Sequence, residues 1–328
     1  MVQSHIINIG YLYLLMVNHL VTTPIKMSEA SSANLIVNND GESLLGSIRS
    51  GDSNVAVVWS DRSGGSVITN AGTIEARLAE GEDYASGSVG VLFRQQDGTT
   101  KNSSTLTNQA GGVIGAQTGV VVGFEGLTND QAVVSISNAG TIDGSDYGLD
   151  LRNGSTITLL DNMEGGTVSG GDAGLRVRGE IITITNKGTI DGAVDVASGG
   201  KVGGFTNEGT IEGSSLSELG VYAIYNAGTM TSLTNEATGK IEGDLFAGSV
   251  GTVTNKGLID GEVTLGSGST LNIEGASARM TGAVTGSAST VNVMGTFATE
   301  NTFDVEVFNI ATGGTLTLAH KITTGPNS

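Results

Sequence analysis

The amino-acid sequence predicts an all-β protein: a single-stranded, right-handed parallel β-helix (solenoid) of about 12 coils with roughly 20 residues in each. Three observations predict it: a short motif that recurs along the chain, the alternation of apolar and polar residues within that motif, and the composition. Of 328 residues, 52 are Gly and 2 are Pro, and aromatic residues make up 4%. The chain is too apolar to be disordered and too poor in large side chains for an ordinary globular core.

The recurring motif reads apolar, Ser or Thr, Asn, any residue, Gly, Thr, apolar, acidic, Gly. Clear copies are ITNAGTIE at 68–75, ISNAGTIDG at 136–144, ITNKGTIDG at 184–192, FTNEGTIEG at 205–213 and VTNKGLIDG at 253–261. The Asn recurs at intervals of 20 to 38 residues, and apolar-Asn-apolar triplets continue the series with Asn272, Asn292 and Asn309. A period near 20 that tolerates insertions is typical of a solenoid.

Each copy of the motif indicates two short strands. Apolar and β-branched residues alternate with polar ones, and Asn-x-Gly interrupts the alternation where a residue with positive φ is cheap. A third strand is visible between copies, in GVVVGF at 119–124, YGLDLRN at 147–153, AGLRVRG at 173–179 and GVYAIYN at 220–226. Strands that pair with the coils above and below lie about 4.8 Å apart, which gives a rod of roughly 60 Å. α-Helix is the weaker alternative, because Gly and β-branched residues recur throughout, with the N-terminal run as the exception.

The repeated Asn is expected to point into the coil. Side chains alternate between the two faces of a strand, and the Asn has the same parity as apolar residues such as Ile136, Ile142, Ile184 and Ile190, which we expect to stack inside. The Asn side chains would hydrogen-bond turn backbones or the next Asn and so form a structural ladder. Its predicted members are Asn70, Asn108, Asn138, Asn186, Asn207, Asn235 and Asn255.

An acidic residue follows the inward apolar residue in most copies, so we expect an outward acidic column on consecutive coils. Its predicted members are Glu75, Asp143, Asp191, Glu212, Glu242 and Asp260. Like charges less than about 5 Å apart repel each other. One interpretation is weak cation binding or contact with a basic ligand. The other is a solvated acidic stripe that Lys187, Lys240 and Lys256 relieve and that keeps the fold soluble.

The sequence predicts no catalytic, metal-binding or cofactor-binding residues, and no cofactor. The formal net charge of −18 would repel nucleic acid, and the lack of Cys excludes disulfides and thiol chemistry. Gly51-Asp52-Ser53 resembles a serine-esterase motif, but the histidines His5, His19 and His320 lie near the termini, so a polar turn is expected there. Gly170-Gly171-Asp172 is interpreted as a loop, because calcium-binding repeats need such segments in tandem.

The chain divides into an atypical apolar N-terminus, residues 1–33, and a β-helix domain, residues 34–328. The N-terminal run is too short and too polar to span a bilayer, and is either an export signal or the product of a misplaced start codon. Loop insertions are expected near 77–104 and 122–133, where a solenoid presents its variable surface. Trp59 is either an exposed contact residue or a cap on the N-terminal end of the stack.

These residues resemble the passenger domains of autotransporters, the type V secretion proteins of Gram-negative bacteria, in which phrases like ITNAGTIDG are common. The stretch VNVMGTFATENTFDVEVFNIATGGTLTLAH at 291–320 is similar to the end of such passengers. The resemblance covers residues 34–320 and implies a location at the cell surface or outer membrane, or outside the cell. It also implies an outer-membrane β-barrel translocator. The chain ends at Ser328 without one, so we expect either a truncated or split gene product or a passenger that lacks its own anchor.

The resemblance implies a surface-exposed or secreted structural and adhesive module. It would contact a host or bacterial cell-surface protein or glycan and have no catalysis of its own. A glycan-active β-helix enzyme is one alternative, and it would need paired carboxylates with Arg or aromatic partners along one face of the rod. A non-functional remnant of a truncated autotransporter is the other alternative.

Overall fold

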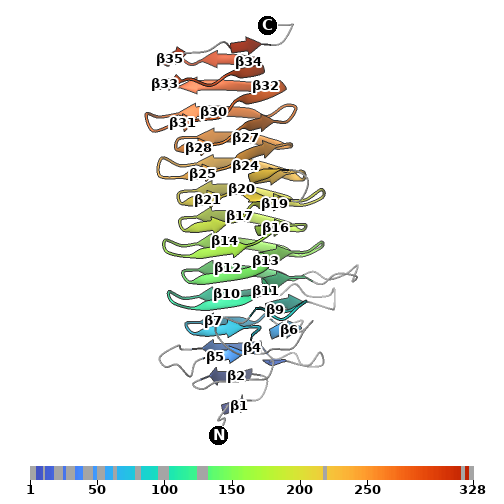
Figure 1. Cartoon of the computed structure of the whole chain (residues 1–328). Coiled ribbons are helices and arrows are strands. Elements are labelled where there is room, and N and C mark those ends of the chain that lie inside the picture. The colour runs from blue at the N-terminus through green and yellow to red at the C-terminus, as the bar shows by residue number, and fades with distance from the viewer. Residues whose placement is uncertain are drawn as a thin grey trace.

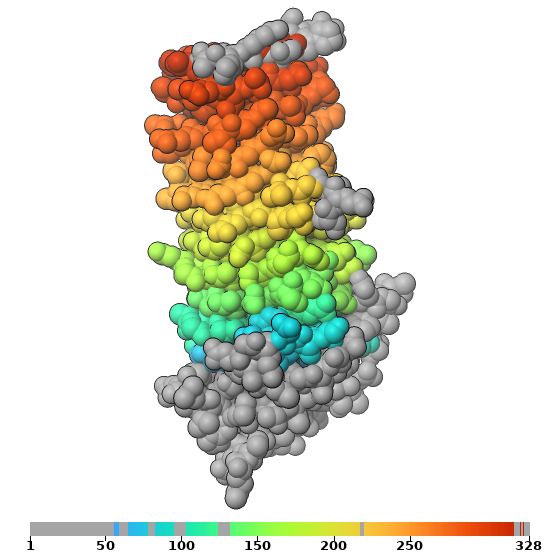
Figure 2. Space-filling model, viewed as in Figure 1, coloured from blue at the N-terminus to red at the C-terminus, as the bar shows by residue number. Residues whose placement is uncertain are grey.

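The protein is a parallel β-helix in which successive coils stack on one another from the N-terminus to the C-terminus (Figure 1). The computed structural model describes residues 56–61, 65–77, 83–94, 103–123, 132–216, 220–318 and 322–324, together with the backbone of five strands between residues 5 and 49. Every element in these ranges is a strand. The described coils form one continuous column (Figure 2).

The first face of the column, face 1, carries the strands that lead into the repeated Asn. Neighbouring strands pair in parallel, and the register joins one Asn to the next, as in Asn108 with Asn138 and Asn186 with Asn207. The strands are β2 (Leu12–Val17), β4 (Asn34–Asn39), β7 (Val67–Asn70), β10 (Ser103–Asn108), β12 (Val133–Asn138), β14 (Thr156–Asn162), β17 (Glu180–Asn186), β20 (Lys201–Asn207), β24 (Thr229–Asn235), β27 (Val250–Asn255), β30 (Thr270–Glu274), and the second halves of β32 (Val284–Met294) and β34 (Phe303–Ile310).

Face 2 follows the Asn-x-Gly turn. Its strands are β5 (Ser47–Arg49), β8 (Thr73–Glu75), β15 (Thr167–Gly170), β18 (Thr189–Asp191), β21 (Thr210–Glu212), β25 (Lys240–Glu242), β28 (Leu258–Asp260) and β31 (Arg279–Met280). The first halves of β11 (Val113–Val122) and β13 (Thr141–Leu151) also belong to face 2, and both strands bend onto face 3. Near the C-terminal end, β33 (Thr296–Thr299) and β35 (Thr315–Leu318) form a separate parallel pair.

Face 3 completes each coil and leads back to face 1. Its strands are β3 (Ile25–Lys26), β6 (Ala56–Asp61), β9 (Val89–Arg94), β16 (Ala173–Val177), β19 (Val194–Val196), β23 (Val221–Asn226), β26 (Asp244–Ala247), β29 (Val263–Leu265), β36 (Ile322–Thr324) and the remaining halves of β11, β13, β32 and β34. Two described pairs are antiparallel: β1 (His5–Ile9) with β2, and β22 (Ser214–Ser215) with β23. The sequence-based prediction of a parallel β-helix is confirmed.

Aliphatic side chains in register fill the interior. Ile136 pairs with Leu160, and Ile142 pairs with Val168 on the next coil; each is at most 1% exposed. Full burial of an Ile, Leu or Val side chain contributes about 1.5–3 kcal/mol, so these columns supply the main driving force for folding. The inward positions predicted from parity are confirmed at Ile68, Ile74, Ile136, Ile142, Ile184, Ile190, Val253 and Ile259.

The Gly of the Asn-x-Gly turn is needed for close stacking and not for a positive φ. Positive φ angles occur at glycines of other turns, such as Gly154 and Gly192, whereas Gly140 and Gly188 have none. A Cβ atom at Gly188 would overlap backbone carbonyl oxygens of the previous coil, including that of Gly166. The expectation of positive φ at these turns is therefore wrong, because the corners stack so closely that a side chain has no room.

Candidate functional site

The buried asparagines of face 1 form one continuous series of hydrogen bonds. Asn70 Nδ2 donates to Asn108 Oδ1 at 2.8 Å, and the same bond recurs on each coil as far as Asn255, at 2.8–2.9 Å. Each member is at most 1% exposed. The structure thus brings together Asn70, Asn108, Asn138, Asn186, Asn207, Asn235 and Asn255, and adds Asn162 from a degenerate copy of the motif.

Each ladder amide also donates a hydrogen bond to the backbone across the corner between faces 1 and 2. Asn138 Nδ2 donates to the carbonyl oxygen of Thr167, and Asn186 Nδ2 to that of Thr210, both at 3.0 Å. Both N–H groups of each amide therefore bond within the interior. Each ladder Asn links face 1 by a hydrogen bond to the first residue of face 2 on the next coil. The ladder has the geometry of a structural device, because its polar atoms are turned away from solvent.

The later asparagines lie on the outer surface. Face 1 register joins Asn255 to Ile273, so the inward row ends there and Asn272 takes the outward position. Asn292 Nδ2 donates to Asn272 Oδ1 at 2.9 Å, and Asn309 Nδ2 donates to Asn292 Oδ1 at 3.0 Å. These three residues form a second, partly exposed row and do not continue the ladder.

Four predicted acidic residues form an exposed column on face 2. Asp191, Glu212, Glu242 and Asp260 pair in register on consecutive coils. Burial raises the pKa of Glu212 above its usual value, and the charges of Asp191 and Glu242 raise it further. The neighbouring carboxylates thus add to the effect of burial in disfavouring the charged form of Glu212.

Glu75 and Asp143 do not join this exposed column. Glu75 is 3% exposed and forms an ion pair with Arg77, with 2.7 Å between Oε1 and Nη2. Asp143 accepts hydrogen bonds from the Tyr84 hydroxyl at 2.7 Å and from Ser169 Oγ at 2.6 Å. A tyrosine from the insertion covers this part of face 2, which is why the expected solvent-exposed column begins only at Asp191.

Gly115 makes room for that tyrosine. It separates Glu75 from Asp143 in the register, and a Cβ atom there would overlap the Tyr84 ring. The Arg77 guanidinium lies 4.9 Å from the centroid of the same ring. Burial, together with the hydrogen bond to Asp143, raises the pKa of Tyr84 well above its usual value, so its hydroxyl keeps its proton. The cluster anchors the insertion to the coil.

The three lysines expected to relieve the acidic column lie elsewhere. Lys187 Nζ is 3.9 Å from Glu208 Oε1, and Lys256 Nζ is 3.1 Å from Glu236 Oε1; both pairs occupy the turn position after a ladder Asn. Lys240 is exposed on face 2, two residues before Glu242. The expectation that Lys187 and Lys256 neutralise the column is wrong, because each has a nearer carboxylate at its own corner. In the described ranges, no group of three or more Asp, Glu or His residues could hold a metal ion.

Face 3 carries a charged cluster that the sequence analysis did not single out. Asp150, on β13, is 2% exposed. Its Oδ2 atom accepts hydrogen bonds from Arg152 Nε at 3.1 Å and from Arg178 Nη2 at 2.8 Å. A signal for this cluster was present, because alternation in YGLDLRN and AGLRVRG places these residues on the outer side of the third strand.

The same outward column continues over the next coils. Arg176 follows Asp150 in register, and Asp195 follows Arg176. The Arg176 guanidinium lies over the Tyr147 ring, 4.8 Å from its centroid. Burial raises the pKa of Asp195, and the positive charges of Arg176 and Arg178 oppose that shift. Charged groups of both signs therefore alternate along this part of face 3.

Aromatic side chains follow the charged residues. Tyr225 pairs with Asp195, and Phe246 pairs with Tyr225 on the next coil. The rings of Tyr225 and Phe246 are stacked, with centroids 5.0 Å apart, and Tyr222 meets Tyr225 edge-on at 5.2 Å. All three rings are half-buried. We call the outward series Asp150, Arg176, Asp195, Tyr225 and Phe246 the face-3 column.

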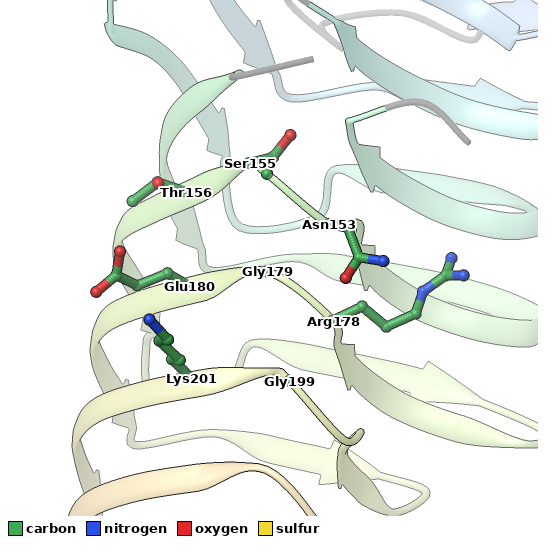
Figure 3. A pocket seen from close by; sticks show the side chains of 9 residues that line it. Asn153, Ser155, Thr156, Arg178, Gly179, Glu180, Gly199 and Lys201 are labelled. Atoms are coloured by element: carbon green, nitrogen blue, oxygen red, sulfur yellow. The ribbon is translucent and has the colours of Figure 1, made fainter. Parts of the chain in front are cut away.

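A shallow pocket lies at the corner between faces 3 and 1. It has a volume of about 300 Å³, and Arg178 connects it to the face-3 column. Figure 3 shows Glu180 and Lys201 on successive coils at one side of the corner, with Asn153 and Arg178 at the other. The Ser155 hydroxyl is buried, has no hydrogen-bond partner among the described residues, and points away from Glu180 and Lys201. The pocket is thus a polar extension of the face-3 column.

Several sequence-based predictions fall outside the described residues. These are Gly51-Asp52-Ser53, His19 and His320, the side chains of His5 and Trp59, and parts of the two predicted insertions, at 78–82, 95–102 and 124–131. Within the ranges that the structure does describe, no helix has the length and apolarity needed to cross a membrane. Comparisons with protein-family models, curated proteins and solved structures found no match.

Proposed function

We propose that the chain is a surface-exposed or secreted module of the autotransporter-passenger type, acting as a structural and adhesive rod at the surface of a Gram-negative bacterium and performing no catalysis of its own. The observation that supports this best is the uninterrupted Asn ladder from Asn70 to Asn255. A ladder that repeats on every coil holds the column in one register, while the outward residues of each coil are free to vary. Such a rod presents long flat faces to a partner.

The charged and aromatic residues of face 3 favour contact with a partner. A solvated stripe needs no arginine held over a tyrosine ring and no stacked aromatic pair on the outer side of a sheet. Half-buried Tyr and Arg side chains are typical of binding surfaces. The net charge of the whole chain, −18, favours solubility of the rod.

A glycan-active enzyme remains the second candidate, on one observation. Asp150 and Asp195 lie two coils apart on face 3, with Arg176 between them and Tyr147 beside it. This is the combination of carboxylates with Arg and aromatic partners that such an enzyme needs. The Asp150 carboxylate is buried and bound by two guanidinium groups, however, so it is poorly placed to exchange a proton with a substrate.

Adhesion of beads tests the proposal. Beads coated with the full chain are incubated with epithelial cells and with Gram-negative bacteria, and attached beads are counted. Beads coated with the same chain after heat unfolding are the control. We expect the folded chain to attach several-fold more beads, because a binding face exists only when the coils are stacked.

Two results would contradict the proposal. Equal attachment of folded and unfolded chain would remove the adhesive role. Shortening of polysaccharides during incubation with the chain, measured as new reducing ends and abolished by Asp195→Asn, would favour the enzyme instead.

A further inference from the structure

We propose that face 3 binds an acidic saccharide, a chain of sugar rings that carry carboxylates, at a site formed by Arg176, Asp195 and Tyr225. This inference rests on the proposed function, since it names the class of surface ligand that the rod holds. The three residues are consecutive members of the face-3 column and lie on neighbouring strands.

Arg176 supplies a positioned guanidinium group. It is half-buried and lies 4.8 Å from the centroid of the Tyr147 ring, which restricts its side chain. Within the described ranges it makes no hydrogen bond and no ion pair. Its planar fork of N–H donors matches the two oxygens of a carboxylate, and a restricted side chain loses little entropy when it binds one. Asp195 on the next coil is its anionic neighbour in the register, and the N–H donors of Arg176 that form no hydrogen bond in the described ranges would bind the carboxylate of a ligand.

Asp195 supplies acceptors for hydroxyl groups. Its carboxylate is half-buried, and in the described part of the chain it accepts no hydrogen bond. Leaving a partly desolvated carboxylate without donors costs free energy, and the hydroxyls of a sugar would supply them. A ligand with a carboxylate for Arg176 and hydroxyls for Asp195 is an acidic sugar.

Tyr225 supplies an apolar surface next to these polar groups. Its ring is fixed by stacking on Phe246 and by the edge contact with Tyr222. The C–H face of a sugar ring packs on such a surface, while its hydroxyls face the polar groups. Three consecutive strands span about 10 Å, which is enough for a sugar ring between the guanidinium and the aromatic ring. Arg178 also lines the corner pocket, so further sugars extend toward Lys201.

The test measures binding of the full chain to immobilised hyaluronan, which carries one carboxylate per disaccharide, and to its methyl ester, in which that charge is removed. Arg176→Gln is expected to raise Kd about tenfold or more, and Tyr225→Leu about threefold to tenfold. Arg279→Gln is the matched control, because it removes an equal charge from an exposed side chain on face 2, and it should change Kd less than about twofold. The ester should bind at least about tenfold more weakly than hyaluronan.

Arg176→Lys separates binding from folding. It keeps the positive charge but loses the bidentate fork, so its Kd should fall between those of the wild type and Arg176→Gln. Circular dichroism of each variant should retain the β-sheet spectrum. Three results would overturn the inference. They are an Arg279→Gln variant that weakens binding as much as Arg176→Gln, equal binding of hyaluronan and its ester, and binding of dextran sulfate but not of hyaluronan.

The bead assay distinguishes this inference from the proposed function. Wild-type beads that attach to cells although the chain binds no hyaluronan would contradict the saccharide site alone. Hyaluronan binding that Arg176→Gln abolishes, combined with no attachment to any cell, would contradict the adhesive role and leave the site in place.

Discussion

Two turns of identical sequence, Asn-Ala-Gly-Thr, differ in the hydrogen bonds of their Asn side chains. One begins at Asn138, at the corner between faces 1 and 2, and the other at Asn226, at the corner between faces 3 and 1. Both Asn side chains have no exposed surface, and in both turns a Cβ atom on the Gly would overlap carbonyl oxygens of the previous coil. The two corners are equally crowded.

The asparagines differ in their hydrogen bonds. Asn138 donates to Asn162 at 2.8 Å and to the Thr167 carbonyl at 3.0 Å, and it accepts from Asn108. Among the residues that the structure describes, neither polar side-chain atom of Asn226 has a hydrogen-bond partner, because the register places Val196 and Ala247 on the neighbouring coils. The local sequence therefore forms the turn. The residues on the adjacent coils determine whether its buried Asn has hydrogen-bond partners, and hence whether the Asn stabilises or destabilises the fold.

The largest effect is expected from breaking the ladder at its middle. Asn186→Ala removes the acceptor of Asn162 and the donor of Asn207, and we expect it to lower the free energy of unfolding by about 2–3 kcal/mol. Urea denaturation followed by circular dichroism measures it. Asn292→Ala, in the partly exposed outer row, is the matched control and should cost no more than about 0.5 kcal/mol. Equal costs at the two positions would show that burial of the ladder contributes nothing.

Removal of the unpaired Asn should have the opposite sign. Asn226→Val replaces two unsatisfied buried polar atoms with the residue type found at the previous coil, Val196. We expect the free energy of unfolding to rise by about 1 kcal/mol. Urea denaturation under the same conditions measures the change.

Supplying a partner for Asn226 sharpens the comparison. Ala247→Asn places an amide beside Asn226, so it should be tolerated better in the wild type than together with Asn226→Val, with a coupling of about 1 kcal/mol between the two sites. A destabilising Asn226→Val, or no coupling, would show that Asn226 already has a compensating interaction.

The features that were predictable from sequence are those that repeat. The ladder and the aliphatic columns recur with fixed parity, so one copy of the motif predicts the next, and even Asn162 in a degenerate copy keeps its place. Asn272 shows the limit of this argument. Its flanking residues Leu271 and Ile273 both point inward, so the triplet has the parity of an outward Asn, which the spacing alone concealed.

The face-3 column was missed because it does not repeat. Asp150, Arg176, Asp195 and Tyr225 occupy equivalent positions on four coils, yet the residue type changes from each coil to the next, and only the register brings them together. The covering of Asp143 was unpredictable for a related reason, since Tyr84 reaches it from a segment whose path no periodicity describes. The contacts and burial of outward-facing side chains on a solenoid depend on neighbouring coils more than on the motif itself.

The smallest predicted effect concerns the stacked carboxylates of face 2. Repetition of an Asn on consecutive coils stabilises the fold, whereas repetition of a charged residue destabilises it. The folded-state pKa of Glu212 is raised, chiefly by burial and then by Asp191 and Glu242, so the folded chain binds this proton more tightly than the unfolded chain does. Stability due to Glu212 is therefore greatest below its unfolded pKa and declines as the pH rises through the folded value. Glu212→Gln should melt at a higher temperature than the wild type at pH 7, with the difference shrinking toward pH 4. Added salt should reduce the difference at pH 7, because Glu212 is exposed. A difference that is independent of pH would show that the stacked carboxylates do not repel one another.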